Sequence, residues 1–243
     1  MKVVAIVQAR MGSTRLPGKV LQDIAGKPML ERVVERLRQA KLIDEVVIAT
    51  TDRAADDVIV EECRRREVRV CRGDENDVLD RYHRAAQTAR AEVVVRVTSD
   101  CPLIDAGITD KTIVAFLEAR PDYAANTLQR TYPRGLDTEV MSADALSRAW
   151  QNARAAYERT HVTPYIYEHA DEFRLLSVTG DADYSGRRWT VDTPEDLELI
   201  RAIYSRFENN ARFTWREVLA VLDREPALLD LNRSIMQKAL HEG

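Results

Sequence analysis

The first hundred residues alternate short apolar runs with stretches in which apolar residues recur every three or four positions. A short apolar run bounded by polar residues is typical of a strand buried on both faces of a parallel sheet. The longer stretches are typical of amphipathic helices. Strands that alternate with helices predict βαβ units with right-handed crossovers. The predicted strands are Val3–Val7, Glu45–Thr50, Val68–Cys71 and Val93–Val97.

A cationic loop joins the first predicted strand to the rest of the chain. It carries Gly12 and Gly18, which allow backbone N–H groups to approach an anion closely. Arg10, Arg15 and Lys19 add three positive charges to the same turn. In open α/β sheets, ligands bind at the carboxyl ends of the strands, where this loop begins. The loop therefore predicts a polyphosphate site, with an ordinary charged surface loop as the alternative.

Two common phosphate motifs do not fit this loop. A P-loop that ends at Lys19 needs glycine at Ser13 and a hydroxyl residue at Val20. The dinucleotide fingerprint needs glycine at Thr14. The loop therefore belongs to a different class of nucleotide-binding turn.

The loop resembles the signature A-R-x-G-S-x-R-(L/I)-P-x-K of the cytidylyltransferases that make CMP-linked Kdo, sialic acids and related sugars. The longer string Q-A-R-M-G-S-T-R-L-P-G-K-V-L is most similar to the spore-coat-polysaccharide branch of that family. The resemblance implies an α/β fold of the Rossmann-like nucleotide-diphospho-sugar transferase type, with a mostly parallel central sheet and flanking helices. It also implies nucleotide binding by Ala9, Arg10, Gly12, Ser13, Arg15 and Lys19.

A second landmark lies near the carboxyl end of the chain. Trp189–Val191 predicts a short strand, and Thr193–Asp196 predicts a helix start with a threonine N-cap, a proline in the first turn and two acidic residues near the helix dipole. This local logic leaves Asp192 unexplained. The segment resembles the V-D-T-P-E-D-L motif of the same family, which implies that Asp192 is a metal ligand.

Asp100 follows the fourth predicted strand, so it is expected at the same sheet edge as the cationic loop. A lone aspartate in such a position is often only a turn cap. The resemblance instead implies a magnesium-binding carboxylate. Ser99-Asp100-Cys101 lacks the Asp-x-Asp motif of many glycosyltransferases that share this broad architecture.

These residues suggest one reaction. Nucleotidyl transfer needs an aligned α-phosphate and neutralised charge rather than covalent chemistry by the protein. Asp100 and Asp192 are expected to bind Mg²⁺, a hard cation that prefers oxygen ligands, while Arg15 and Lys19 hold the triphosphate. These four are the predicted catalytic residues. The resemblance implies that CTP and a sugar react to give a CMP-sugar and pyrophosphate.

The turn after the third predicted strand contains Arg72 and Gly73. Glycine allows close backbone approach, and the arginine can meet a phosphate or a base. The resemblance implies that this turn lines the nucleotide pocket. The simpler interpretation is a helix start, because Asp77 is a good N-cap for Val78–Ala89.

Other helices are predicted from caps and periodicity. Asp52 or Asp56 can cap a helix that runs to about Arg66, and Ser142 can cap one through Ala153. A further helical segment is expected to begin within 158–165, with Pro164 in its first turn. The remaining predicted helices lie in residues 205–243.

The composition of the chain changes beyond Asp110, where strands are predicted at 122–126, 136–141 and 173–179. The resemblance implies that residues of about 120–180 form an insertion that binds the acceptor sugar and contributes to a homodimer. The acceptor-side candidates are Arg134, Asp137, Glu139 and His161, with structural roles as the alternative.

Length and composition fit a single domain over residues 1–243. A formal net charge of -4 argues against a nucleic-acid binder. The three cysteines form no C-x-x-C pair, and the amino terminus lacks a secretory pattern, so a cytoplasmic protein is expected. No window approaches ~18 consecutive apolar residues, so no membrane insertion is expected.

Two other functions remain open from the sequence. A glycosyltransferase of the same fold would consume a nucleotide sugar and release no pyrophosphate. A non-catalytic nucleotide-binding protein would bind CTP without turnover, although such proteins tend to lose their metal ligands.

Overall fold

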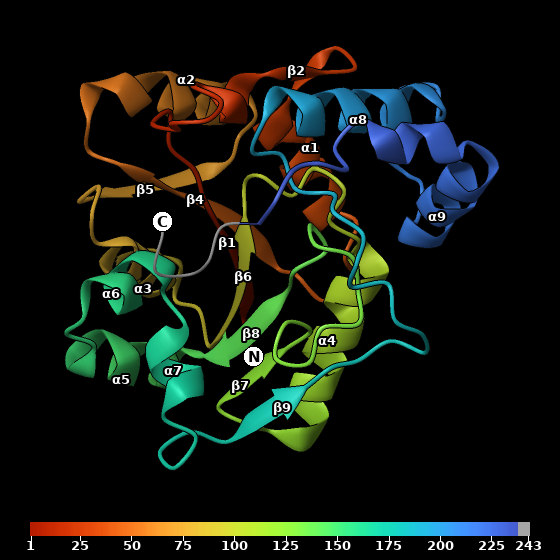
Figure 1. Cartoon of the computed structure of the whole chain (residues 1–243). Coiled ribbons are helices and arrows are strands. Elements are labelled where there is room, and N and C mark those ends of the chain that lie inside the picture. Colours follow the sequence, from red (N-terminus) through yellow and green to blue (C-terminus); the bar gives the residue numbers. More distant parts are fainter. Residues whose placement is uncertain (238–243) are drawn as a thin grey trace.

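The computed structural model describes residues 1–237, which form a mixed sheet covered by helices (Figure 1). The strand order is β5-β4-β1-β6-β8-β7-β9. The first four are mutually parallel, β8 is antiparallel to both of its neighbours, and β9 is parallel to β7. The strands are β1 (Val3–Gln8), β4 (Glu45–Thr51), β5 (Arg69–Gly73), β6 (Val93–Thr98), β7 (Tyr123–Ala125), β8 (Glu139–Ser142) and β9 (Leu175–Ser177). The predicted fold class is confirmed.

Helices cover both faces of this sheet because β1 is apolar on both sides. Val3, Ala5 and Val7 pack in one core cluster, whereas Val4 and Ile6 pack in another. The first cluster is closed by α1 (Met29–Leu37), α2 (Asp57–Arg65) and α4 (Ala106–Ala119). The second is closed by α3 (Val78–Ala89), α5 (Ala143–Asn152) and α7 (Pro164–Glu168). Helix α6 (Ala156–His161) packs against α3 beside them (Figure 1).

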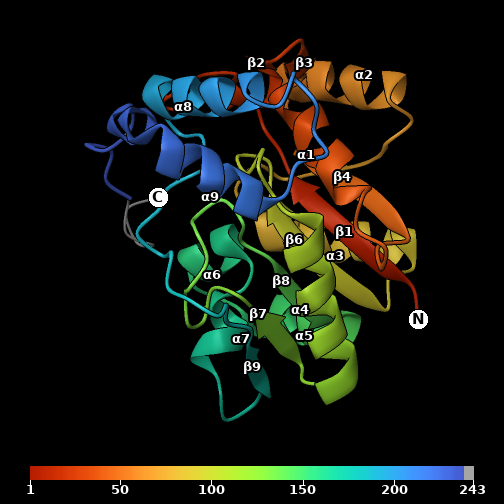
Figure 2. The same cartoon turned by 90° about the vertical axis from the view of Figure 1, so that its right-hand side faces the viewer.

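A third apolar cluster joins the carboxyl-terminal helices to the body of the molecule. It contains buried residues of α8 (Pro194–Ser205) and α9 (Trp215–Arg224) together with Ile24 and Leu103. Figure 2 shows α8 beside the hairpin of β2 (Asp23–Ile24) and β3 (Lys27–Pro28). The 3₁₀ helices are η1 (Lys19–Leu21), η2 (Ala54–Asp56) and η3 (Pro226–Asp230). None of the helices in residues 1–237 has both the length and the apolar character needed to cross a bilayer.

The capping predictions are largely confirmed. The side chains of Asp77, Ser142 and Thr193 accept the backbone N–H groups of Asp80, Ala145 and Asp196 respectively. The start of α8 is a complete capping box with proline in the first turn. The capping residues in the sequence therefore explain where each of these helices begins.

Two local predictions are wrong in detail. Trp189–Val191 is not a strand. The preceding residue, Arg188, forms an isolated β-bridge with Arg134, and Val191 then bonds to the turn that follows β6. Asp56 stands at the start of α2, but its carboxylate makes no capping bond and points toward the cationic loop instead. The helix predicted to begin within 158–165 is confirmed, because α7 starts at Pro164, just after Val162, with a φ of 74°, ends α6.

Strand register brings the candidate residues to one sheet edge. Gln8 of β1 is paired with Thr98 of β6, so the cationic loop and the turn that contains Asp100 leave the sheet side by side. The backbone N–H of Val191 donates to the carbonyl of Asp100 at 2.9 Å. Asp192 is thereby placed next to Asp100, although the two are far apart in the sequence.

Candidate active site

The cationic loop is anchored by a buried carboxylate that the sequence analysis assigned to a helix cap. Oδ1 of Asp56, which is 2 % exposed, accepts the backbone N–H of Met11 at 2.7 Å. Its other oxygen accepts the hydroxyl of Thr51 at the end of β4. At the far end of the loop, Gly18 has a φ of 66° and donates to the carbonyl of Met11 at 3.1 Å. The loop is therefore closed on itself and fixed to the neighbouring strand.

The middle of this loop presents a row of unused donors. The backbone N–H groups of Gly12, Ser13, Thr14 and Arg15 have no acceptor within residues 1–237. The Ser13 hydroxyl accepts from Leu16 at 3.4 Å, which folds the row into a turn. Successive backbone donors in such a turn form an anion-binding concavity.

The ammonium of Lys19 lies at the point where three segments meet. Its Nζ donates to Oδ2 of Asp100 at 3.2 Å, to Oδ1 of Asp192 at 2.8 Å and to the carbonyl of Val191 at 2.9 Å. The Lys19 side chain is only 14 % exposed. Burial lowers the pKa of this ammonium, but the attraction of the two carboxylates outweighs burial and raises that pKa above its ordinary value. The cationic loop and the two distant aspartates therefore converge.

Asp192 is surrounded by cations. Besides Lys19, Arg15 lies 3.1 Å and Arg188 lies 2.8 Å from Oδ2 of Asp192. Burial opposes ionisation of this carboxyl, but Lys19, Arg188 and Arg15 together lower its pKa to about 2. The carboxylate is charged at any physiological pH and is available to a cationic ligand.

The two aspartates fit a divalent cation only in part. Residues 1–237 contain no group of three or more His, Cys, Asp or Glu side chains that could hold a metal. Oxygens of Asp100 and Asp192 nevertheless share one cation, the Lys19 ammonium, which marks a position suited to positive charge. Mg²⁺ usually takes one or two carboxylates and completes its shell with phosphate oxygens and water. This donor set therefore suits a metal that arrives with a nucleotide.

The turn after β5 has mainly structural contacts. The guanidinium of Arg72 donates to the carbonyls of Thr51 and Arg53 and pairs with Asp57 at 2.7 Å. A Cβ on Gly73 would lie 3.0 Å from Cγ of Arg81, so this glycine makes room for a buried arginine. The structure thus ties Arg72 to the protein and gives Gly73 a packing role.

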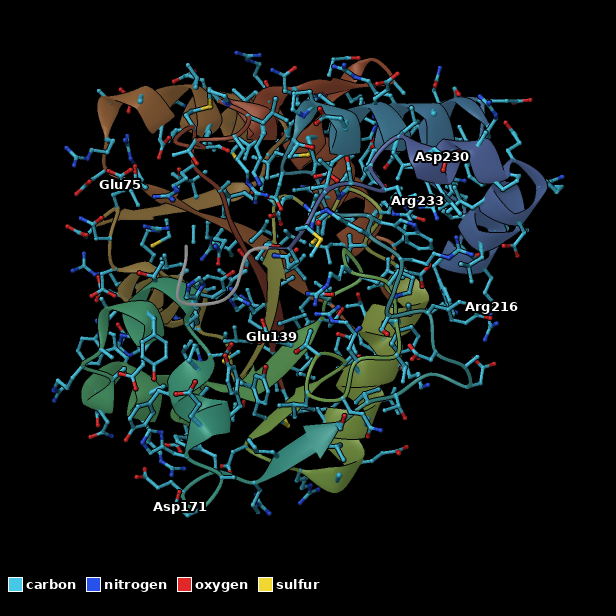
Figure 3. The ribbon with its side chains drawn as sticks, viewed as in Figure 1. Glu75, Glu139, Asp171, Arg216, Asp230 and Arg233 are labelled. Atoms are coloured by element: carbon cyan, nitrogen blue, oxygen red, sulfur yellow. The ribbon has the colours of Figure 1, made fainter. Side chains whose placement is uncertain are left out.

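The remaining loop candidates lie around this turn. Ala9 is 3 % exposed at the root of the cationic loop. The guanidinium of Arg10 is half exposed and lies 3.6 Å from Glu75. Figure 3 shows Glu75 at the rim of the molecule, beyond β5. Arg10 therefore borders the outer end of the anion-binding turn.

A cavity of about 410 Å³ contains three of the four acceptor-side candidates. Asp137, Glu139 and His161 line it, and Figure 3 shows Glu139 near the middle of the molecule on β8. Two arginines that the sequence analysis did not single out also line this cavity. Arg96 pairs with Glu139, and Arg130 binds Asp137 through two bonds of 2.6 and 2.8 Å.

This cavity lies next to the cationic loop. Nη2 of Arg96, which lines the cavity, donates to Oε1 of Gln8 at 3.3 Å, and Gln8 is the last residue of β1 before the loop. The buried Cys101 thiol donates to Oδ1 of Asp100 at 3.6 Å, and its pKa is raised first by burial and then by the charges of Asp100 and Asp137.

Arg134 does not line the cavity, and its guanidinium has no hydrogen bond or ion pair to any described residue. The Arg134 backbone forms a bridge with Arg188 and accepts the N–H of Trp189 at 2.8 Å, so Arg134 lies beside the segment that leads to Asp192. Burial and the positive charges of Arg130 and Arg188 lower the Arg134 pKa, although Asp137 opposes this shift.

Comparison with known proteins decides the family. The family model described as cytidylyltransferase matches residues 4–222 of the chain. The chain belongs to the cytidylyltransferase family. Its predicted family and its predicted class of enzyme, a nucleotidyltransferase, are confirmed.

Relatives of this cytidylyltransferase cover nearly its whole length. The spore coat polysaccharide biosynthesis protein SpsF of Bacillus subtilis is 34% identical over 92% of this chain and 95% of its own. An uncharacterized protein of Methanocaldococcus jannaschii is 37% identical over 100% of this chain and 99% of its own. A 3-deoxy-manno-octulosonate cytidylyltransferase of Anaeromyxobacter sp. is 34% identical over 83% of this chain and 97% of its own.

Solved structures agree with this assignment. A cytidylyltransferase from Leptospira borgpetersenii superposes with a TM-score of 0.91 at 36% identity, over 98% of this chain and 100% of that one. A CMP:2-keto-3-deoxy-manno-octonic acid synthetase complexed with CTP has a TM-score of 0.64 at 22% identity, over 85% of this chain and 100% of that one. The second likeness concerns the fold alone.

Proposed function

We propose that this cytidylyltransferase transfers CMP from CTP to a hydroxyl group of a sugar or sugar acid and releases pyrophosphate. The observation that carries the proposal is the meeting of Lys19, Asp100 and Asp192 beside a loop of unused backbone donors. The names of the SpsF and 3-deoxy-manno-octulosonate relatives support an acceptor of this class and a role in surface polysaccharide synthesis.

The cationic loop would hold the triphosphate. The N–H groups of Gly12 and Ser13 face no protein acceptor, so phosphate oxygens would satisfy them. Lys19 and Arg15 would move from the Asp192 carboxylate to the phosphates, because a triphosphate carries more negative charge than the carboxylates. Arg10 with Ala9 would border the base. Arg72 and Gly73 would keep their contacts with the protein and would not bind the nucleotide.

Asp100 and Asp192 would hold Mg²⁺. When bound, the metal neutralises phosphate charge and makes the acceptor hydroxyl more acidic. In the transfer, the acceptor oxygen attacks the α-phosphorus, the bond from that phosphorus to the bridging oxygen breaks, pyrophosphate leaves, and the hydroxyl proton passes to water. The residues of this chain contribute alignment and charge.

The acceptor would occupy the cavity next to this centre. Asp137 pairs with Arg130, and Glu139 pairs with Arg96. The two carboxylates would orient these guanidinium groups, and their remaining lone pairs would accept hydrogen bonds from acceptor hydroxyls. His161 lines the same cavity. Arg134 is the candidate for an anionic group of the acceptor, because its guanidinium has no partner among the described residues.

We further propose that the enzyme acts in the cytoplasm as a homodimer. The three cysteines are free thiols, as is usual in a reducing compartment. Size-exclusion chromatography with light scattering tests the dimer, and a monomeric mass at micromolar concentration would contradict it.

Pyrophosphate release tests the proposed reaction. The purified chain is incubated with Mg²⁺, one nucleoside triphosphate and a panel of sugars and sugar acids. We expect release with CTP and at least one acceptor, and little release with UTP, GTP or ATP. A chain that transfers sugar from a nucleotide sugar without releasing pyrophosphate would be a glycosyltransferase, and one that binds CTP but never turns it over would be a binding protein.

A further inference from the structure

Arg188 joins two carboxylates at the start of α8. Its Nη2 lies 2.8 Å from Oδ2 of Asp192 and 3.0 Å from Oδ2 of Asp196, and its Nε donates to Oδ1 of Asp196 at 3.0 Å. The Arg188 side chain is 9 % exposed.

The second carboxylate is immobile. Asp196 is fully buried and accepts the backbone N–H groups of Asp192 at 2.9 Å and Thr193 at 3.1 Å. Its other oxygen accepts the amide of Asn232 at 2.9 Å. Asp196 therefore fixes the backbone at Asp192 and the guanidinium of Arg188 at the same time.

This arrangement sets the direction of the Asp192 carboxylate. Arg188 holds Oδ2, so Oδ1 is turned toward Lys19 and Asp100. Rotation of the carboxylate would break the bond to Arg188, which cannot follow because Asp196 holds it through two bonds.

Arg15 contacts the same oxygen at 3.1 Å but differs in its surroundings. It belongs to the cationic loop, its side chain is 30 % exposed, and Asp192 is its partner among the described residues. Arg15 can leave Asp192 for a phosphate, whereas Arg188 is held in place. The two arginines that contact Asp192 therefore have different roles: Arg15 can bind a phosphate, and Arg188 holds the carboxylate.

We propose that Arg188 is a positioning residue, which keeps Oδ1 of Asp192 aimed at the shared cation position in both the free and the nucleotide-bound enzyme. This inference rests on the proposed function, in which Asp100 and Asp192 hold a divalent cation together with CTP. Removal of a group that hydrogen-bonds to a metal ligand and orients it typically lowers metal affinity or activity by about 10–100-fold.

The test compares binding of CTP with and without metal. Isothermal titration calorimetry measures CTP affinity in Mn²⁺ and in EDTA, without an acceptor, so that no turnover occurs. For Arg188→Met we expect CTP affinity in Mn²⁺ to fall about 10-fold or more, and affinity in EDTA to stay within about two-fold. Arg188→Lys retains one cation for Asp192 and should restore part of the loss.

Arg187→Met is the matched control. Its guanidinium lies 3.6 Å from Asp223 and its side chain is 30 % exposed, so its loss should leave both affinities unchanged. If Arg188→Met fails to fold, Arg188→Lys and Asn232→Ala carry the test, and both should weaken only the metal-dependent binding.

The possible outcomes distinguish the role of Arg188 from the proposed metal site. Wild-type enzyme that binds CTP equally in Mn²⁺ and EDTA would overturn the proposed metal site and this role with it. Wild-type metal dependence that Arg188→Met retains would overturn the role alone. An equal loss in Mn²⁺ and EDTA in a folded Arg188 variant would also overturn it, since that result indicates a general structural contribution.

Discussion

The Nζ atom of Lys19 lies 2.8 Å from Oδ1 of Asp192, although 173 positions separate the two residues. The same ammonium reaches Asp100, 81 positions away, at 3.2 Å. Two neighbouring, partly buried carboxylates repel each other unless a cation lies between them. Lys19 supplies that cation in the free enzyme, and binding of a metal–nucleotide complex would exchange it for another.

The two aspartates should be essential for turnover. We expect Asp100→Asn and Asp192→Asn each to lower kcat by about 10²-fold or more, because each replaces a charged oxygen ligand by a neutral amide at the site of developing charge. Steady-state pyrophosphate release measures the effect. The exposed Asp183, whose carboxylate accepts the backbone N–H of the neighbouring Ser185, provides the control Asp183→Asn. Unchanged kcat in both active-site variants would contradict the assignment.

Lys19 should act on both binding and chemistry. Lys19→Met is expected to raise KM for CTP and to lower kcat by about 10²-fold, since it removes a donor from the triphosphate in the ground state and in the transition state. Lys27→Met is the matched control, because Lys27 pairs with Glu31 and Glu35 on α1. Equal kinetics in the two variants would show that Lys19 only neutralises the aspartates.

Asp56 should matter through the loop that it anchors. Asp56→Asn keeps the size of the side chain but replaces one carboxylate oxygen by an NH₂ group. That group cannot accept the hydrogen bond from the Met11 N–H or from the Thr51 hydroxyl. We expect the free energy of unfolding to fall by about 1–3 kcal/mol and KM for CTP to rise more than kcat falls. Urea denaturation and kinetics measure the two effects. A variant with lower stability but wild-type KM would show that the anchor does not shape the nucleotide site.

Gly135 should be irreplaceable for a geometric reason. Its φ is 101°, and a Cβ there would lie 2.7 Å from the carbonyl carbon of Trp189. Gly135→Ala should therefore destabilise the fold by at least about 1–3 kcal/mol and displace the segment that leads to Asp192. Gly186→Ala is the control, because nothing lies within 4 Å of its added Cβ. Thermal denaturation that shows equal Tm values for the two variants would contradict this account.

The sequence predicted the parts of the molecule that are encoded locally. The strands of the parallel half, the caps at Asp77 and Thr193 and the cationic loop all follow from short-range patterns. Asp192 was recognisable because the capping logic explained its neighbours but not the residue itself. The metal roles of Asp100 and Asp192 came from the family resemblance and stay a prediction.

The contacts that the sequence could not predict join charges from distant segments. Arg96 binds Glu139 across β6 and β8, and Arg188 binds Asp196, which Asn232 also reaches. A sequence with this many arginines and carboxylates offers many pairings, and only the tertiary fold selects among them. Trp189–Val191 has strand-like composition, yet its backbone pairs with the Asp100 turn rather than with a strand.

The most direct test of the central claim is a crystal structure of the chain with CTP and Mn²⁺, in which anomalous scattering locates the metal. We predict a metal coordinated directly by oxygens of both Asp100 and Asp192, with the triphosphate on the N–H groups of Gly12 and Ser13 and with Lys19 moved onto the phosphates. A metal that binds away from both carboxylates, or a triphosphate that does not contact the cationic loop, would contradict the account.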